Sequence, residues 1–93
     1  MLKIFAVCGM GLGTSVILKS RLKEALNAQG VDYMLDVTDA SAASGQDADI
    51  IFTSDELAQK IRNKKAKIVV INNFTSRPEI KEKVEVAVAE LGR

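Results

Sequence analysis

The most constraining feature of this 93-residue chain is a glycine-rich segment near its start. A short apolar run, residues 4–7, ends at Cys8, and Gly9, Gly11 and Gly13 then occupy every second position. A long helical pattern begins directly after them. Because glycine carries no side chain, backbone amides in such a segment can approach a ligand closely. The pattern therefore predicts a buried strand, a tight loop and the start of a helix.

This arrangement is typical of an anion site. The N–H groups of a helix's first turn lack partners within the helix, and the helix dipole makes that end positive. A strand, a glycine loop and a helix start together form a socket that suits a phosphoryl group.

Cys8 lies at the mouth of the predicted socket. A free thiol has a pKa of about 8.5, and a helix N-terminus can lower this value to about 3.5–7.5. The resulting thiolate is a nucleophile that could carry phosphate covalently. The alternative is that Cys8 is a small buried hydrophobic residue that ends a strand.

The sequence contains no histidine and only one cysteine. These absences exclude catalysis by Ser-His-Asp or Cys-His groups, and they argue against a zinc site. If the chain performs chemistry, Cys8 is its nucleophile by elimination. A single cysteine also excludes an intramolecular disulfide, and a free thiol is expected in a reducing cytoplasm.

The overall composition indicates one small domain, residues 1–93. Net charge is +1, from 13 basic and 12 acidic residues, which gives no reason to expect nucleic acid or an anionic membrane as a partner. No apolar run approaches the roughly 18 residues of a membrane span. The segment before Gly9 is too short for a signal peptide.

Hydrophobic periodicity predicts alternating strands and helices. Thr14 or Ser15 is expected to cap the first helix, and Gly30 to end it. Residues 39–46 have poor caps and no apolar face, so we expect a loop with one helical turn. The predicted strands are 3–7, 31–37, 49–53 and 68–71, and the predicted helices are 14–29, 56–63 and 79–91.

The alternation predicts an α/β fold, an open parallel sheet of four strands with helices on both faces. In the order 2-1-3-4, we expect the first helix on one face and the later helices on the other. A ligand crevice would then lie between the ends of strands one and three, beside Cys8.

Two nucleotide-binding motifs fail at the same position. The dinucleotide fingerprint and the Walker loop each require a glycine where Thr14 stands. The thiol phosphatase loop, Cys-x5-Arg-[Ser/Thr], matches from Cys8 to Ser15 except for its arginine. Without that arginine to clamp phosphate oxygens, and without a nearby acid, a phosphocysteine would hydrolyse slowly. The residues therefore favour a phosphate carrier over a phosphatase.

The run A-V-C-G-M-G-L-G-T-S, together with A-D-I-I-F-T-S, resembles enzyme IIB of the bacterial sugar phosphotransferase system. The ascorbate type is the most similar, the galactitol type is a near relation, and the lactose/cellobiose type is less similar. The resemblance covers essentially the whole chain. It implies a fold similar to that of the low-molecular-weight tyrosine phosphatases.

The resemblance also implies a role for each part of the loop. Cys8 would take phosphate from a phosphohistidine on the IIA component and pass it to a sugar held by the membrane component IIC, with no metal or cofactor. Two alternatives remain, a small cysteine phosphatase and a non-enzymatic anion-binding or regulatory module with an inert thiol. The implied phosphate loop comprises Gly9, Met10, Gly11, Leu12, Gly13, Thr14 and Ser15.

Residues outside the loop carry open interpretations. Thr53 and Ser54 could contact the phosphate or cap the next helix. Arg77 could meet phosphate or a partner, or be an ordinary surface residue. Lys19 and Lys23 could help partners to dock or simply be solvated.

Met10 and Leu12 alternate with the glycines, so we expect at least one of them to form an exposed apolar contact for IIA or IIC. The alternative is that both fold back onto the core.

Overall fold

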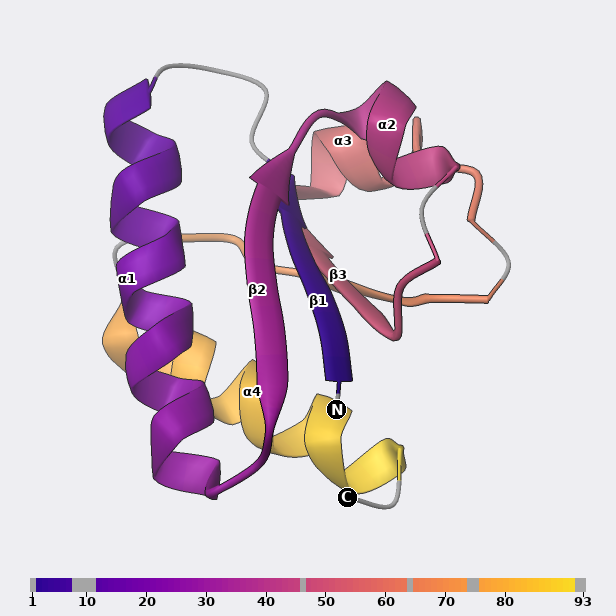
Figure 1. The fold of residues 1–93 in the computed structure, drawn as a ribbon. Coiled ribbons are helices and arrows are strands. Elements are labelled where there is room, and N and C mark those ends of the chain that lie inside the picture. The colour runs from indigo at the N-terminus through magenta and orange to yellow at the C-terminus, as the bar shows by residue number, and fades with distance from the viewer. Residues whose placement is uncertain (1, 8–11, 46, 64, 74–75, 92–93) are drawn as a thin grey trace.

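The computed structural model describes residues 2–7, 12–45, 47–63, 65–73 and 76–91. Strands and helices alternate along these residues, as the sequence predicted (Figure 1). The elements are β1 (Leu2–Val7), α1 (Leu12–Gln29), β2 (Tyr33–Thr38), α2 (Ala40–Ser44), β3 (Ile50–Thr53), α3 (Asp55–Ala58), β4 (Lys67–Val70) and α4 (Arg77–Glu90).

The strands form a parallel sheet in the predicted order β2-β1-β3-β4. Their C-terminal ends are level, because Val7 pairs with Thr38 on one side and with Thr53 on the other, and Thr53 in turn pairs with Val70. One row across the sheet therefore contains the last residue of every described strand.

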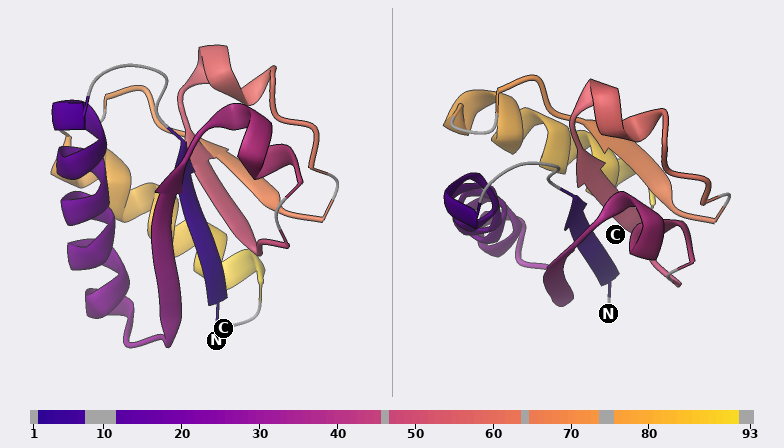
Figure 2. Two further views of the ribbon diagram at one scale, coloured as in Figure 1. Left: turned by 45° about the horizontal axis from the view of Figure 1, so that its top comes forward. Right: turned by 90° about the horizontal axis from the view of Figure 1, so that it is seen from above.

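The sheet separates two hydrophobic cores. In the first core, Leu22 of α1 and Val84 of α4 are fully buried against side chains such as Ile4 of β1. In the second core, Val7 packs with Ala43 of α2. Figure 2 shows α1 and α4 on one side of the sheet and α2 on the other.

The prediction that all later helices lie opposite the first is therefore wrong for α4. A helix that connects two parallel strands has its face set by the right-handed crossover rule. Within the described residues α4 follows the last strand and connects to no other, so the rule does not apply to it. It packs against α1 and β4 and completes the first core.

The ends of α1 differ in how well the sequence predicted them. The helix begins at Leu12, so Thr14 and Ser15 lie within its first turn and the prediction that either is the cap is wrong. Gly30 follows the last residue with a φ of 68°, a conformation that glycine adopts at little cost. Its predicted role as the helix stop is confirmed.

The predicted loop at residues 39–46 contains a five-residue helix, α2. Its cap is a good one, contrary to the prediction, because the Asp39 carboxylate accepts the Ala42 N–H at 2.7 Å. The fully buried Ala43 then anchors the helix in the second core.

The helix predicted over residues 56–63 is shorter than expected. α3 ends at Ala58, and Ile61 enters the second core from outside the helix. Asn63 then donates its side-chain N–H to the Ala43 carbonyl at 2.9 Å. Contacts with the sheet and with α2 therefore override the local helical pattern.

The last helix starts two residues earlier than predicted. Ser76 caps α4 by accepting the N–H of Glu79 at 3.3 Å. The Glu79 carboxylate reaches back and accepts the N–H groups of Asn72 and Asn73, at 2.7 and 2.9 Å. One carboxylate thus joins the first turn of α4 to the loop that follows β4.

The two cores give a direct stability test on α4. Val84 is fully buried and Val86 is 50% exposed on the same helix. We expect Val84→Ala to lower the free energy of unfolding by about 2 kcal/mol, from lost burial and the cavity that remains. The control, Val86→Ala, should stay within about 0.5 kcal/mol. Denaturant unfolding measures both, and equal effects would contradict the assignment of Val84 to the core.

The Glu79 contacts give a second test. Glu79→Gln keeps the shape of the side chain but removes the charge and one acceptor oxygen, and should lower the free energy of unfolding by about 1 kcal/mol. Glu82→Gln, at an exposed position on the same helix, is the matched control. If thermal unfolding does not separate the two variants, Glu79 does not hold the loop as described.

Candidate functional site

The C-terminal edge of the sheet contains the point where the chain reverses its direction of winding. From β1 the chain passes over one face through α1 to reach β2, and from β2 it passes over the other face through α2 to reach β3. Open parallel sheets bind ligands at such a switch point, outside the strand ends. The sheet order places this switch point between the C-terminal ends of β1 and β3, as predicted.

Val7 is the last residue of β1, so Cys8 is attached directly to the strand that the switch point flanks. The predicted site residues Cys8, Gly9, Met10 and Gly11 lie outside the described part of the chain. For residues 12–15, the rest of the predicted phosphate loop, the structure describes the backbone as the first turn of α1.

The start of α1 has the electrostatics that an anion site requires. The helix is 18 residues long and begins at the same end of the sheet as the strand C-termini (Figure 1). Its first turn contains no acidic residue, so no side-chain carboxylate there compensates the positive end of the dipole. The N–H groups of this turn lack partners within the helix.

Thr53 contacts Val7, the residue that precedes Cys8. Its hydroxyl donates to the carbonyl oxygen of Val7 at 3.1 Å, and the residue is fully buried. Among the residues whose burial is described, it is the buried polar one in an otherwise apolar core. The sequence hinted at it as the one polar residue in the run Ile50–Thr53, but it could not reveal the strand register.

Ser54 and Arg77 have structural contacts. Ser54 caps α3 by accepting the N–H of Leu57 at 3.3 Å, in agreement with the capping interpretation. Arg77 is 65% exposed, and its Nε lies 3.5 Å from a carboxylate oxygen of Glu24 on α1. The Arg77 side chain, at the start of α4, therefore points toward α1.

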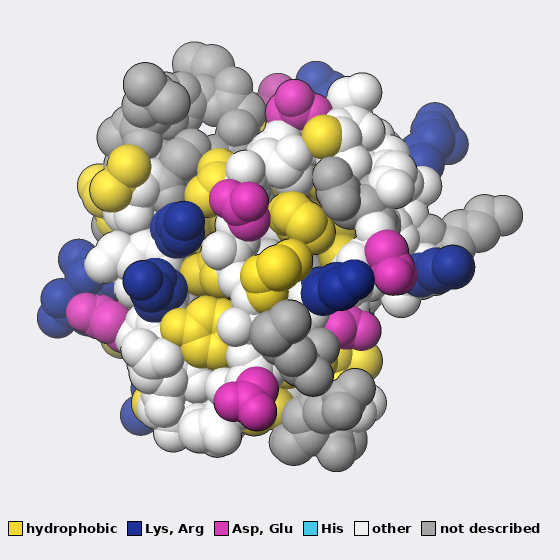
Figure 3. All heavy atoms as spheres, in the orientation of Figure 1, with side chains coloured by type: hydrophobic (Ala, Val, Ile, Leu, Met, Phe, Trp, Pro, Cys, Tyr) yellow, Lys and Arg dark blue, Asp and Glu magenta, His cyan; other side chains and the backbone are white. Residues whose placement is uncertain are grey.

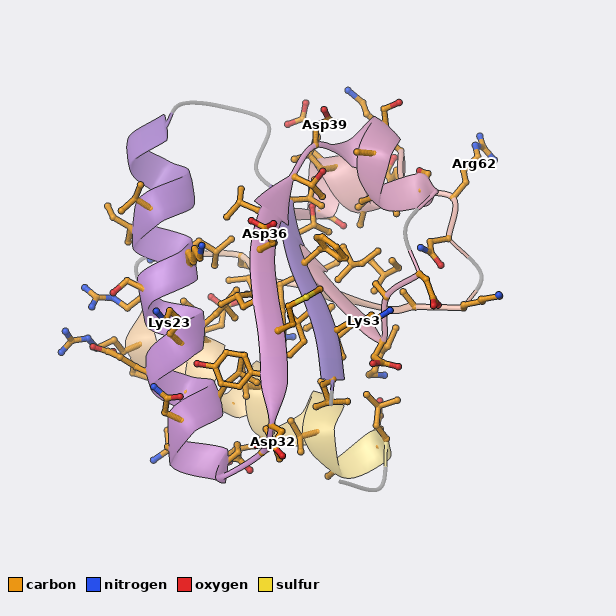
Figure 4. The ribbon with its side chains drawn as sticks, in the orientation of Figure 1. Lys3, Lys23, Asp32, Asp36, Asp39 and Arg62 are labelled. Carbon is orange, nitrogen blue, oxygen red and sulfur yellow. The ribbon has the colours of Figure 1, made fainter. Side chains whose placement is uncertain are left out.

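The lysines of α1 lie beyond its first turn. Figure 4 shows Lys23 about midway along the helix, away from the edge where β2 passes into α2 at Asp39. Lys23 is exposed and Lys19 is partly buried. On the face drawn in Figure 3, acidic and basic side chains are interspersed rather than separated by sign.

Two exposed apolar residues near the start of α1 were not identified from the sequence. Val16 and Ile17 are 67% and 40% exposed, although both are large and hydrophobic. They precede the fully buried Leu18. Three consecutive apolar residues cannot all face the same side of a helix, so the sequence did contain a signal for this exposed pair.

Within the described residues, no helix combines the length and the apolar character needed to cross a membrane.

Comparison with known proteins agrees with the fold. The family described as "PTS system, Lactose/Cellobiose specific IIB subunit" matches residues 3–86. The ascorbate-specific PTS system EIIB component of Mycoplasma pneumoniae is 33% identical over 84 residues, covering 87% of this chain and 88% of that protein.

A solved structure supports the same architecture. The lactose-specific IIB component domain of the phosphotransferase system from Streptococcus pneumoniae aligns with a TM-score of 0.58 at 18% identity, over 97% of this chain and 93% of that one. At this identity the likeness concerns the fold, which is the phosphatase-like α/β fold that the sequence predicted. The chain belongs to the family of IIB subunits of the sugar phosphotransferase system, which serve in sugar phosphotransfer with IIA and IIC components.

Proposed function

We propose that this chain, as a single IIB domain, carries phosphate on Cys8 within a sugar phosphotransferase system. The observation that carries the proposal is the position of the single cysteine, directly after β1 at the switch point of a IIB fold. We assign Gly9–Ser15 as the phosphate loop. An uncompensated helix N-terminus is suited to the roughly −1.5 to −2 charge that a phosphoryl group adds.

The proposed chemistry consists of two displacements at phosphorus. The Cys8 thiolate attacks a phosphohistidine of IIA, so that an S–P bond forms as the P–N bond breaks and the imidazole keeps the electron pair. A sugar hydroxyl bound to IIC then attacks the phosphocysteine. An O–P bond forms, the S–P bond breaks, the hydroxyl proton passes to solvent, and the thiolate is regenerated.

Two structural contacts support a carrier over a phosphatase. A thiol phosphatase needs an arginine over the phosphate oxygens and an acid for the leaving group. Arg77, the candidate for the first role, reaches Glu24 on α1 instead. Glu79, a carboxylate beside the loop after β4, has one oxygen on each of two backbone N–H groups. The Glu79 carboxylate therefore has a structural role, and the Arg77 guanidinium lies beside α1.

We further propose that Val16 and Ile17 belong to the surface that contacts IIA and IIC. Both are exposed apolar residues one turn beyond the start of α1, close in sequence to the proposed loop. An exposed apolar pair beside a reactive group is suited to a partner that docks and leaves. Met10 and Leu12 remain proposed members of the same surface.

Ascorbate is the carbohydrate that we propose as the final acceptor. The curated relative at 33% identity is ascorbate-specific, whereas the lactose-specific structural neighbour is only 18% identical. The single free thiol is compatible with a reducing cytoplasm, where we propose that the protein acts.

The carrier role predicts a phosphate adduct on one atom. After incubation with a phosphorylated IIA component, wild-type protein should gain one phosphoryl group, and peptide mass spectrometry should assign it to Cys8. Cys8→Ser should fold normally and gain none. A phosphorylated Cys8→Ser protein, or a wild-type adduct on another residue, would exclude Cys8 as the carrier.

The carrier role also predicts little hydrolysis. With an aryl phosphate as substrate, wild-type protein should release inorganic phosphate at a rate close to that of Cys8→Ser, because the loop lacks the arginine that stabilises the transferring group. Fast turnover that disappears in Cys8→Ser would instead establish a cysteine phosphatase.

A further inference from the structure

We propose that Thr53 is a positioning residue for Cys8, which extends the proposed phosphoryl transfer and rests on it. The Thr53 hydroxyl donates to the carbonyl oxygen of Val7 at 3.1 Å. That carbonyl belongs to the peptide that links Val7 to Cys8. The hydrogen bond thus acts on the last peptide group before the proposed nucleophile.

Thr53 is itself held in place by its neighbours. Thr53 and Val7 are both fully buried and are paired in the sheet. The backbone of Thr53 is held from the other side, because its carbonyl accepts the N–H of Ile71 at 2.8 Å. The next residue, Ser54, begins α3 as its cap. The hydroxyl therefore extends from a residue that the sheet and the following helix hold in place.

A peptide group is planar, so a constraint on its carbonyl also constrains the direction in which the chain continues. The carbonyl oxygen of Val7 carries a partial negative charge. Its hydrogen bond to Thr53 directs this oxygen toward β3, and so away from the proposed phosphate. The sheet pairing of Val7 with Thr53 already holds this peptide from the backbone, and the hydroxyl adds a second donor to the same carbonyl. Its removal weakens the constraint on the last peptide group before Cys8 without unpairing the strand.

The other neighbour of Val7 provides a matched control. Thr38 of β2 pairs with Val7 from the opposite side and is also the last residue of its strand. Its side chain makes no hydrogen bond to any residue of the described ranges, and it is partly exposed. Thr38→Val therefore repeats the same chemical change beside Val7 without removing the hydrogen bond.

The test uses the full chain and two readouts. The first is the single-turnover rate of phosphate transfer from a phosphorylated IIA component to Cys8. The second is the rate of alkylation by iodoacetamide across a pH series, which reports on Cys8 alone because the chain has one cysteine. Thr53→Val should slow transfer about tenfold, the change expected from one hydrogen bond. Its alkylation profile should shift toward the free-thiol value of about 8.5.

Two further variants separate positioning from stability. Thr53→Ser and Thr53→Ala both lose the methyl group, and only the serine keeps the hydroxyl. We expect Thr53→Ser to stay within about threefold of wild type and Thr53→Ala to match Thr53→Val. This pair also decides the question if Thr53→Val fails to fold. Thr38→Val should behave as wild type in both readouts.

The inference is overturned if the serine and alanine variants transfer phosphate and react with iodoacetamide at equal rates, or if Thr38→Val has the same effect as Thr53→Val. A wild-type protein that accepts no phosphate would contradict the carrier function instead. The alkylation profiles would still decide whether Thr53 positions the thiol.

Discussion

The parallel pairing of β1 with a strand on each side is the constraint on which the rest of the structure depends. The strand is buried on both faces, with Ile4 in the first core and Val7 in the second. Because β2 and β3 are reached over opposite faces of the sheet, the end of β1 lies at the switch point. Val7, which precedes the cysteine in the sequence, is level there with the last residues of both neighbouring strands.

The described charges near this edge are compatible with the proposed phosphate site. The first turn of α1 lacks acidic residues, which leaves the helix dipole available to a phosphoryl group. The two nearby groups considered for a phosphatase mechanism have other contacts: Arg77 lies beside Glu24 on α1, and Glu79 accepts backbone N–H groups. This division suits a protein whose role in sugar phosphotransfer is to receive phosphate and release it to another component.

The fold could be predicted because the hydrophobic patterns that indicate its strands and helices are local and repeat along the chain. Three apolar runs and one weakly alternating segment, residues 31–37, predicted the four strands, and their alternation with helices predicted the parallel sheet. The buried residues of the two long helices recur at helical spacing, and they are Leu18, Leu22, Ala25 and Leu26 on α1, and Ile80, Val84, Ala87 and Val88 on α4.

Other features depend on tertiary contacts that no local pattern encodes. The face chosen by α4 is decided by the half of the sheet that α1 leaves open, and α3 ends early because Ile61 enters the second core. The hydrogen bond from Thr53 to Val7 depends on a register between strands 46 residues apart.

The cap at Ser76, in contrast, could have been predicted from the local sequence. Ser-x-x-Glu is a capping signature, and we did not use it to predict the start of the helix.

The central claim is that the phosphoryl group resides on sulfur. Phosphorus NMR of the protein after phosphorylation by its IIA donor tests this claim most directly, because a phosphorus atom bonded to sulfur resonates apart from one bonded to oxygen. We expect a single thiophosphate resonance that disappears when phosphate passes to the sugar. A phosphoester resonance from a hydroxyl such as that of Thr14 or Ser15, in place of the thiophosphate signal, would contradict it.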